Sequence, residues 1–149
     1  MRQQPPVPRF TVITLGVSDI RRSIAFYQAL GFERKLRATG EAVAFFETGG
    51  TVISLFPRAE LAKDATLAEG KPLAAFRGFT LAWNCSSTEE VDAVLKFAIS
   101  KGASLLKPSR RTDYGGYSGY FVDPDGYPWE VVVAPGIDVG EDRRVHLPD

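Results

Sequence analysis

The residue of this sequence best suited to chemistry is Glu130, a carboxylate that stands between Trp129 and a run of three valines, 131–133. Apolar surroundings raise the pKa of a carboxylic acid, and a raised pKa suits proton transfer near neutral pH. Glu130 is therefore a candidate general base, with Tyr120 as a candidate partner. Two other interpretations stay open. Glu130 could orient a bound ligand without reacting, or it could be a structural glutamate held by a neighbouring hydroxyl or arginine.

The residues around Glu130 predict a β-hairpin that decides whether Tyr120 can meet it. The aromatic and β-branched runs 117–122 and 127–133 flank Asp123-Pro124-Asp125-Gly126. Proline presets φ early in a turn, and glycine accepts the positive φ that closes one. A turn over residues 124–126 pairs Tyr120 with Glu130 on one face, whereas a two-residue turn removes that pairing.

The rest of the chain predicts two modules with the same order of elements, βαβββ. In residues 10–57, a helix begins at Ser18-Asp19 and ends at Gly31, between strands at 10–17, 32–36, 42–47 and 51–56. In residues 78–135, a helix begins at a Ser87–Glu90 capping box and ends at Gly102, between a strand at 79–85, a strand at 104–107 and the hairpin. We predict an α+β fold, with a flexible arm at 1–9, a linker at 58–77 and a polar tail at 136–149 that has little to bury.

Charge and composition exclude several classes of partner. Eighteen basic residues balance eighteen acidic ones and neither sign forms a block, so we expect no binding to nucleic acid or to a membrane surface. The N-terminal residues contain no apolar segment of the kind found in secretory signals. Cys85 is the one cysteine, which suits a reducing compartment, and we expect a cytoplasmic protein.

Two motifs, TLGVSDIRRSIAFYQALGF at 14–32 and GGYSGYFVDPDGYPWEV at 115–131, resemble the vicinal oxygen chelate superfamily. That superfamily includes glyoxalase I, extradiol dioxygenases and bleomycin-resistance proteins. The resemblance implies that the two modules form a curved mixed β-sheet cup with the helices outside. It also implies a small molecule in the cup and, in the metal-dependent members, a divalent ion.

The resemblance places the metal ligands of those members at Val12, Ser54, Thr80 and Glu130 of this sequence. Only Glu130 matches, because valine has no lone pair and hydroxyls bind divalent ions weakly. The one histidine, His146, lies in the C-terminal tail. We therefore predict no metal site and no cofactor.

Strand alternation from the matched positions predicts which side chains line the cup. Ser54, Phe56 and Asn84 would point inward, while Trp83 would lie beneath the second helix. Tyr114 would lie in a glycine-rich loop with Arg110 and Arg111, which could close over the cup but which we favour as a solvated connection. The predicted ligand-binding residues are Ser54, Phe56, Asn84, Tyr114, Tyr120 and Glu130.

These residues favour a protein that binds a small organic molecule, either a drug or a metabolite, without a metal ion. The alternative is a metal-independent isomerase or lyase with Glu130 as its base. A metal-dependent lyase or dioxygenase fits less well because its ligands are missing. We also expect a homodimer, since two-fold pairing is the commonest form of oligomer.

Overall fold

The chain is described here from a computed structural model, for residues 4–70 and 76–149. Two four-stranded sheets have the same internal order, β1-β4-β3-β2 in the first and β5-β8-β7-β6 in the second. The first module contains β1 (Val12–Val17), α1 (Ile20–Ala29), β2 (Glu33–Lys35), β3 (Ala44–Glu47) and β4 (Val52–Pro57). The second contains β5 (Leu81–Asn84), α3 (Thr88–Ser100), β6 (Ser104–Arg111), β7 (Tyr117–Val122) and β8 (Pro128–Val133). This repeat confirms the predicted α+β fold with mixed sheets.

Both long helices begin where the sequence predicted. The Asp19 carboxylate accepts a hydrogen bond from the Arg22 amide at 3.2 Å, and the Ser87 hydroxyl accepts one from the Glu90 amide at 3.1 Å. The Glu90 carboxylate bonds the amide of Ser86 at 2.7 Å, one residue before the position expected in a capping box. Each cap satisfies amides that the first helical turn cannot pair.

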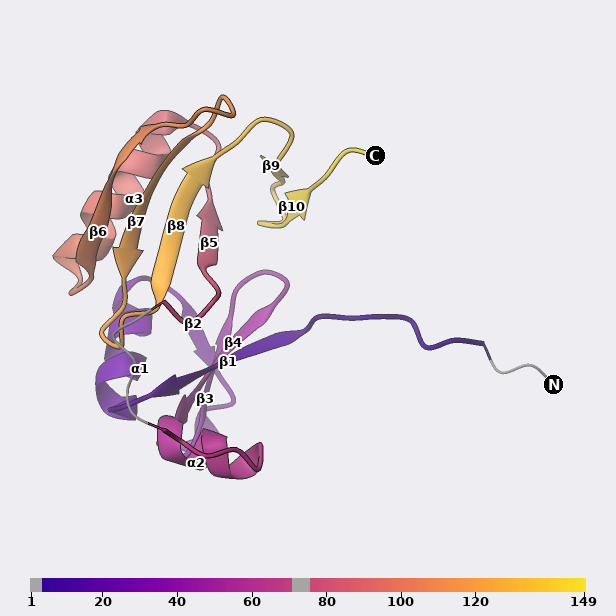
Figure 1. Ribbon diagram of the computed structural model, residues 1–149, viewed down its shortest axis with the longest axis vertical. Helices are drawn as coiled ribbons and strands as arrows, with labels where there is room; N and C mark the ends of the chain where they lie inside the picture. The colour runs from indigo at the N-terminus through magenta and orange to yellow at the C-terminus, as the bar shows by residue number, and fades with distance from the viewer. Residues whose placement is uncertain (1–3, 71–75) are drawn as a thin grey trace.

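In each module the helix covers one face of its own sheet (Figure 1). Leu15 and Leu55 are fully buried in the first sheet, and Phe121 and Val131 in the second. Alternation sends their strand neighbours to the opposite face, so each sheet has an apolar side against its helix and a second, more open side.

The hairpin between β7 and β8 joins the two modules. The Tyr27 hydroxyl on α1 donates a hydrogen bond to Asp123 at 2.7 Å, and the Tyr127 hydroxyl donates to the Gly16 carbonyl at 2.7 Å. Tyr27 is fully buried and also packs its ring against Trp129, at 6.1 Å between centroids. The first helix is therefore bonded to the second sheet as well as packed on the first.

The predicted linker contains a further helix, α2 (Arg58–Asp64), and residues 71–75 of it lie outside the described part. This helix packs beside β1 on the face opposite to Leu15. A Cβ atom added to Gly16 would lie 3.3 Å from Cα of Arg58. The open face of the first sheet is thus partly covered by α2.

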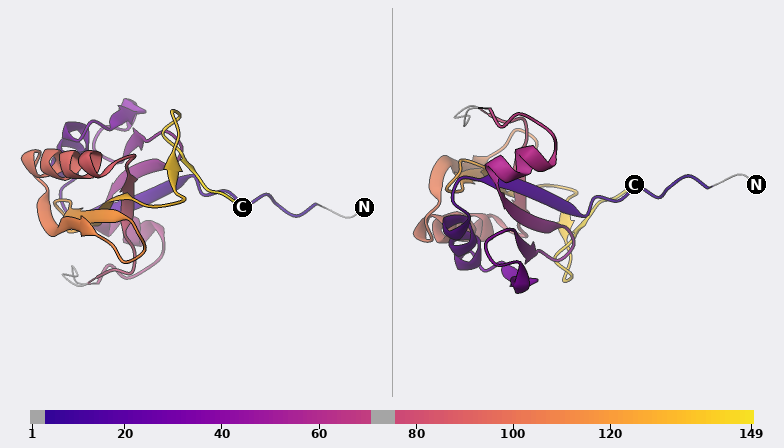
Figure 2. Two further views of the ribbon diagram at one scale, coloured as in Figure 1. Left: turned by 90° about the horizontal axis from the view of Figure 1, so that it is seen from above. Right: turned by 90° about the horizontal axis from the view of Figure 1, so that it is seen from below.

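The two ends of the chain differ from each other. The predicted arm is described from residue 4 onward, and its residues 4–9 are exposed and run away from the rest of the chain (Figure 2). The C-terminal tail buries little, and it forms a small hairpin that the sequence did not predict, of β9 (Asp138–Val139) and β10 (Val145–His146). The Arg144 Nε atom donates to the Gly49 carbonyl at 2.9 Å and fixes this hairpin on the turn before β4.

None of the described helices combines the length and the apolar character that crossing a membrane requires.

Candidate functional site

Glu130 and Tyr120 lie side by side on the open face of the second sheet. Tyr120 of β7 pairs directly with Glu130 of β8, as the longer of the two turns considered predicts. Burial raises the pKa of Tyr120, and the carboxylate of Glu130, with which its hydroxyl interacts, raises that pKa further. Tyr120 therefore stays protonated through the physiological pH range and presents a hydrogen-bond donor beside an acceptor.

Tyr114 extends this cluster towards solvent. It lies close enough to Tyr120 to add to the shift of its pKa, and it remains 55% exposed. The predicted loop around it is shorter than expected, because Arg110 and Arg111 belong to β6 and pair with Ser118 and Tyr117 of β7. Two arginines fixed in a strand ladder cannot close over the sheet as a loop would.

The residues predicted on the first sheet lie apart from this cluster. Ser54 is only 2% exposed and Phe56 is half-buried, on the same side of the sheet as Gly16 and α2. Asn84, half-buried on β5, pairs with Val132 and so shares the face of Glu130. The structure thus groups Tyr114, Tyr120 and Glu130, with Asn84 farther along the same face.

The described residues do not offer a metal site. Across 4–70 and 76–149, no three His, Cys, Asp or Glu side chains lie close enough together to hold an ion. Of the four family positions, Val12, Ser54 and Thr80 carry no carboxylate or imidazole, and Glu130 faces a tyrosine. This donor set does not fit a zinc or iron site, which takes three or four protein ligands.

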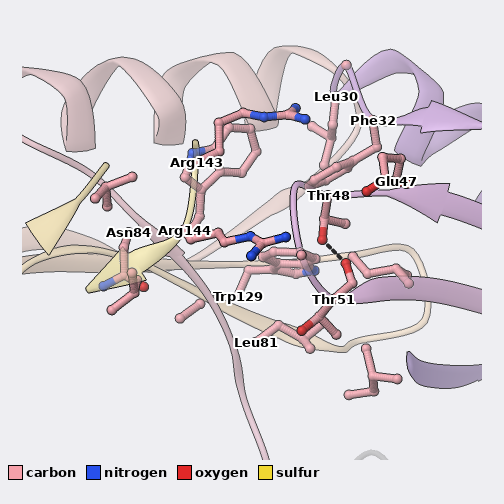
Figure 3. A pocket seen from close by; sticks show the side chains of 18 of the residues that line it. Leu30, Phe32, Glu47, Thr48, Thr51, Leu81, Asn84, Trp129, Arg143 and Arg144 are labelled. Carbon is pink, nitrogen blue, oxygen red and sulfur yellow. Dashed lines mark hydrogen bonds between the residues drawn. The ribbon is translucent and has the colours of Figure 1, made fainter. Parts of the chain in front are cut away.

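A cavity lies elsewhere, between the modules. Its volume is about 1110 Å³, and the free edge of β5, the end of α1, the turn before β4 and the C-terminal hairpin surround it. Of the predicted ligand-binding residues, Asn84 alone belongs to its lining, as Figure 3 shows. Trp83 lines it too: this side chain is half-buried against Phe32 of the first module, at 5.7 Å between ring centroids.

Sequence reasoning missed this cavity because its walls come from distant segments. The sequence predicts Trp83 as a packing residue beneath the second helix, and it places Arg143 and Arg144 in a polar tail with little to bury. The Gly49-Gly50 pair was the one available signal, since a double glycine permits another segment to approach the backbone closely. A Cβ atom added to Gly49 would lie 3.1 Å from Cβ of Arg143.

The repeat of βαβββ modules and the paired hairpin define a family. A family model described as Glyoxalase/Bleomycin resistance protein/Dioxygenase superfamily matches residues 9–131, and the chain belongs to that superfamily.

Among curated proteins, the chain is similar to the metallothiol transferase FosB of Lysinibacillus sphaericus, with 27% identity over 91% of both sequences. Among solved structures, it is similar to a glyoxalase-related enzyme from Fulvimarina pelagi. That match has a TM-score of 0.84 and 28% identity, and it covers 96% of this chain and 100% of the other. A lactoylglutathione lyase from Agrobacterium tumefaciens has the same fold, with a TM-score of 0.65 and 24% identity over 86% of this chain and 95% of its own.

Proposed function

We propose that this protein binds a small organic molecule, a drug or a metabolite, on the open face of the second sheet, and that it does so without a metal ion. The observation that carries the proposal is the Tyr120–Glu130 pair, which presents a donor and an acceptor together on that face. Ala82, which is exposed beside Glu130, adds apolar surface. A few polar groups set in an apolar surface are typical of sites that orient a small ligand.

The charge of this cluster indicates the kind of ligand. Glu130 contributes a carboxylate, and Tyr114 and Tyr120 contribute two rings with their hydroxyls. Aromatic faces attract other rings and cations, and a carboxylate attracts a positive or hydrogen-bond-donating group. We therefore propose an uncharged or weakly cationic molecule that contains an aromatic part.

A metal-independent isomerase or lyase is the second candidate, and the same pair favours it. Glu130 would take the proton and the Tyr120 phenol would stabilise the developing negative charge on the substrate by donating a hydrogen bond. The FosB relative is named a metallothiol transferase, and a metal-bound thiol would require a metal site. The donor set of this chain does not support that chemistry.

A thermal-shift screen of aromatic drugs and metabolites tests the binding proposal, because a ligand of the native state raises its apparent stability. We expect at least one compound to raise the Tm of the wild-type protein. Tyr120→Phe and Glu130→Ala should reduce the shift, while Glu89→Gln, an exposed change on α3, should leave it intact. A shift that survives both site variants unchanged would place the ligand elsewhere, and a screen with no shift would remove the basis of the proposal.

Glu130→Gln separates binding from catalysis, because the amide keeps the shape of the side chain but cannot act as a base. Retained binding with lost turnover would favour the enzyme. Metal analysis of the purified protein completes the test: a full equivalent of zinc or iron would contradict a metal-independent function.

We also propose that the protein forms a homodimer. In the described sheets β1 and β5 each have one edge without a strand partner, and the arm before β1 exposes Val7 and Phe10. Free strand edges and exposed apolar side chains are sites where a second chain can pair. Light scattering after size exclusion should give twice the monomer mass, and a monomer at high concentration would contradict this.

A further inference from the structure

The cavity between the modules reaches Ala82 and Asn84 at the edge of the Tyr120–Glu130 face, but it does not include the pair itself. Trp129 and Glu130 are neighbours in β8, so their side chains lie on opposite faces of the sheet. Trp129 lines the cavity, while neither Glu130 nor Tyr120 does. A ligand in this cavity would not contact the pair on which the proposed function depends.

One wall of the cavity is aromatic. Phe32, at the end of α1, lies 5.7 Å from Trp83 and 5.8 Å from Trp129, measured between ring centroids, and all three line the space. The rings are tilted to each other by 54° and 33°, so they form a curved wall. Such a wall offers ring faces and edges against which a planar aromatic molecule can pack.

The opposite wall carries two guanidinium groups from the C-terminal hairpin. In Figure 3 the Arg144 side chain extends into the cavity towards Thr48 and Thr51, and Arg143 extends along its edge towards Leu30. The Arg144 Nε atom is bonded to the Gly49 carbonyl at 2.9 Å. Within the described chain its two terminal nitrogens have no acceptor, so they remain available to a ligand.

The acidic residues of the lining are largely engaged with groups other than Arg144. Glu33 forms an ion pair with Lys35 at 2.6 Å, and the charge of Arg143 also lowers the pKa of that carboxyl, though by less than Lys35 does. The Glu90 carboxylate accepts the Ser86 amide at 2.7 Å. Glu47, which also lines the cavity, pairs with Glu33 in the β2–β3 ladder. Within the described residues the Arg144 guanidinium forms no ion pair with a carboxylate of the lining, although the Asp142 carboxylate, which accepts the Arg144 amide, is near enough for the charge of Arg144 to lower its pKa.

We propose that this cavity is a second binding site, for a planar aromatic molecule that carries a carboxylate or sulfonate group. The ring would pack on the wall of Phe32, Trp83 and Trp129, and the anion would accept hydrogen bonds from the terminal nitrogens of Arg144. A guanidinium whose Nε is already fixed loses little further freedom when it binds an anion, and charge-assisted bonds of this kind are the strong ones. The volume of about 1110 Å³ accommodates a ligand of drug size.

The protein's own fluorescence can test this, because both of its tryptophans line the cavity. The probe is 8-anilinonaphthalene-1-sulfonate, an aromatic anion that accepts energy from excited tryptophan. We expect saturable binding with energy transfer. Arg144→Gln should weaken it about tenfold, the loss expected for one charge-assisted hydrogen bond. Arg21→Gln, which also removes an exposed arginine charge but lies on α1, should bind the probe as the wild type does.

A neutral probe of similar shape, N-phenyl-1-naphthylamine, provides the control for folding. It should bind Arg144→Gln and wild type equally, because it depends on the aromatic wall alone. In the wild type, 1-naphthoate should displace the sulfonate probe at lower concentration than 1-naphthalenemethanol does, and this comparison requires no variant. Glu130→Gln should leave every one of these results unchanged, so this site and the proposed function can fail separately.

Three results would overturn the proposal. Equal affinity of wild type and Arg144→Gln for the sulfonate probe would exclude the guanidinium contact. Displacement of the sulfonate probe at equal concentrations of naphthoate and alcohol would also exclude the guanidinium contact, and this test requires no variant. Probe binding that appears only after residues 1–9 are deleted would show that the N-terminal arm, and not a small molecule, occupies the cavity, which Phe10 already lines.

Discussion

Asp125, at the tip of the β7–β8 hairpin, accepts two hydrogen bonds from Ser18, which lies 107 residues earlier at the start of α1. The Ser18 amide lies 2.9 Å from Oδ1 of Asp125 and the Ser18 hydroxyl 2.8 Å. The second carboxylate oxygen accepts from Ser23 at 3.1 Å. The turn motif that identifies the family is therefore also what joins the two modules.

Asp125→Ala should lower the free energy of unfolding by about 2 kcal/mol, because it leaves polar groups of Ser18 and Ser23 without their acceptor. The Asp125 side chain is only 8% exposed, so water replaces it poorly. Urea unfolding followed by circular dichroism measures the loss. Asp113→Ala, on an exposed loop, is the control and should change stability by less than about 0.5 kcal/mol. Equal stability of the two variants would show that the junction does not depend on this carboxylate.

Tyr27→Phe should destabilise the fold by about 1 to 3 kcal/mol, since it removes the donor to buried Asp123 and the acceptor of the Trp129 indole N–H. Tyr127→Phe removes a different buried hydroxyl, and its loss of stability can be compared with that of Tyr27→Phe. Its hydroxyl bonds a backbone carbonyl, that of Gly16, and no carboxylate. Thermal unfolding of both variants gives the two losses, and an unchanged Tm for Tyr27→Phe would contradict the role assigned to its hydroxyl.

The loss in Tyr27→Phe should also depend on pH. Burial raises the pKa of Asp123, while the Tyr27 hydrogen bond opposes that rise, so removing the hydroxyl raises the pKa further. A carboxyl whose folded-state pKa is raised favours folding below its unfolded pKa, and that contribution is lost as pH rises through the folded-state pKa. The variant should therefore be closer in stability to the wild type in acid than at neutral pH, and urea unfolding at both pH values measures the difference. If Tyr27→Phe loses the same free energy of unfolding, relative to wild type, at both pH values, the role assigned to the Asp123 carboxyl is wrong.

Gly49→Ala should release the C-terminal hairpin from the turn before β4. Gly49 has φ of +95°, and its added Cβ would lie 3.1 Å from Cβ of Arg143. Strain of this kind costs about 1 to 3 kcal/mol. Gly50→Ala is a matched control, because its Cβ would make only ordinary contact, at 3.6 Å from Nε of Arg144. The proton resonances of His146, the one histidine in the sequence, should shift towards those of an unstructured peptide in Gly49→Ala alone.

Cys85 should resist thiol reagents in the folded protein. It is 2% exposed, and burial raises its pKa to about 12. Only the thiolate reacts, so in mildly alkaline buffer the folded protein should react about a thousandfold more slowly than the protein in guanidinium chloride. Absorbance after addition of a disulfide reagent measures both rates. Fast reaction of the folded protein would show that the second sheet opens readily near β5.

The α1 and α3 helices and the β7–β8 hairpin could be predicted because their start, end and register depend on residues that are close in the sequence. The Asp19 and Ser87 caps, the helical spacing of apolar residues and the Pro124–Gly126 turn each act within a few positions. The pairing of Tyr120 with Glu130 follows from that turn, because the number of turn residues fixes the register of the strands.

The cavity and the C-terminal hairpin could not be predicted, because they depend on contacts between distant segments. Strands of two residues, such as β9 and β10, have no periodicity to detect. Arg144 is held by a backbone carbonyl, and every residue type supplies one. Trp83 shares the helix-covered face of the second sheet with its partner Val131, but its contact with Phe32 of the other module and its place in the lining of the cavity could not be predicted.

The bonds from α1 to the β7–β8 hairpin have a consequence for synthesis of the chain. When α1 leaves the ribosome, the acceptors that Ser18 and Tyr27 need in Asp125 and Asp123 have not yet been translated. The first module therefore emerges with an incomplete interface, although domains generally fold in the order of their synthesis. We expect the nascent chain to become resistant to protease in one late step, after residue 127 has left the exit tunnel.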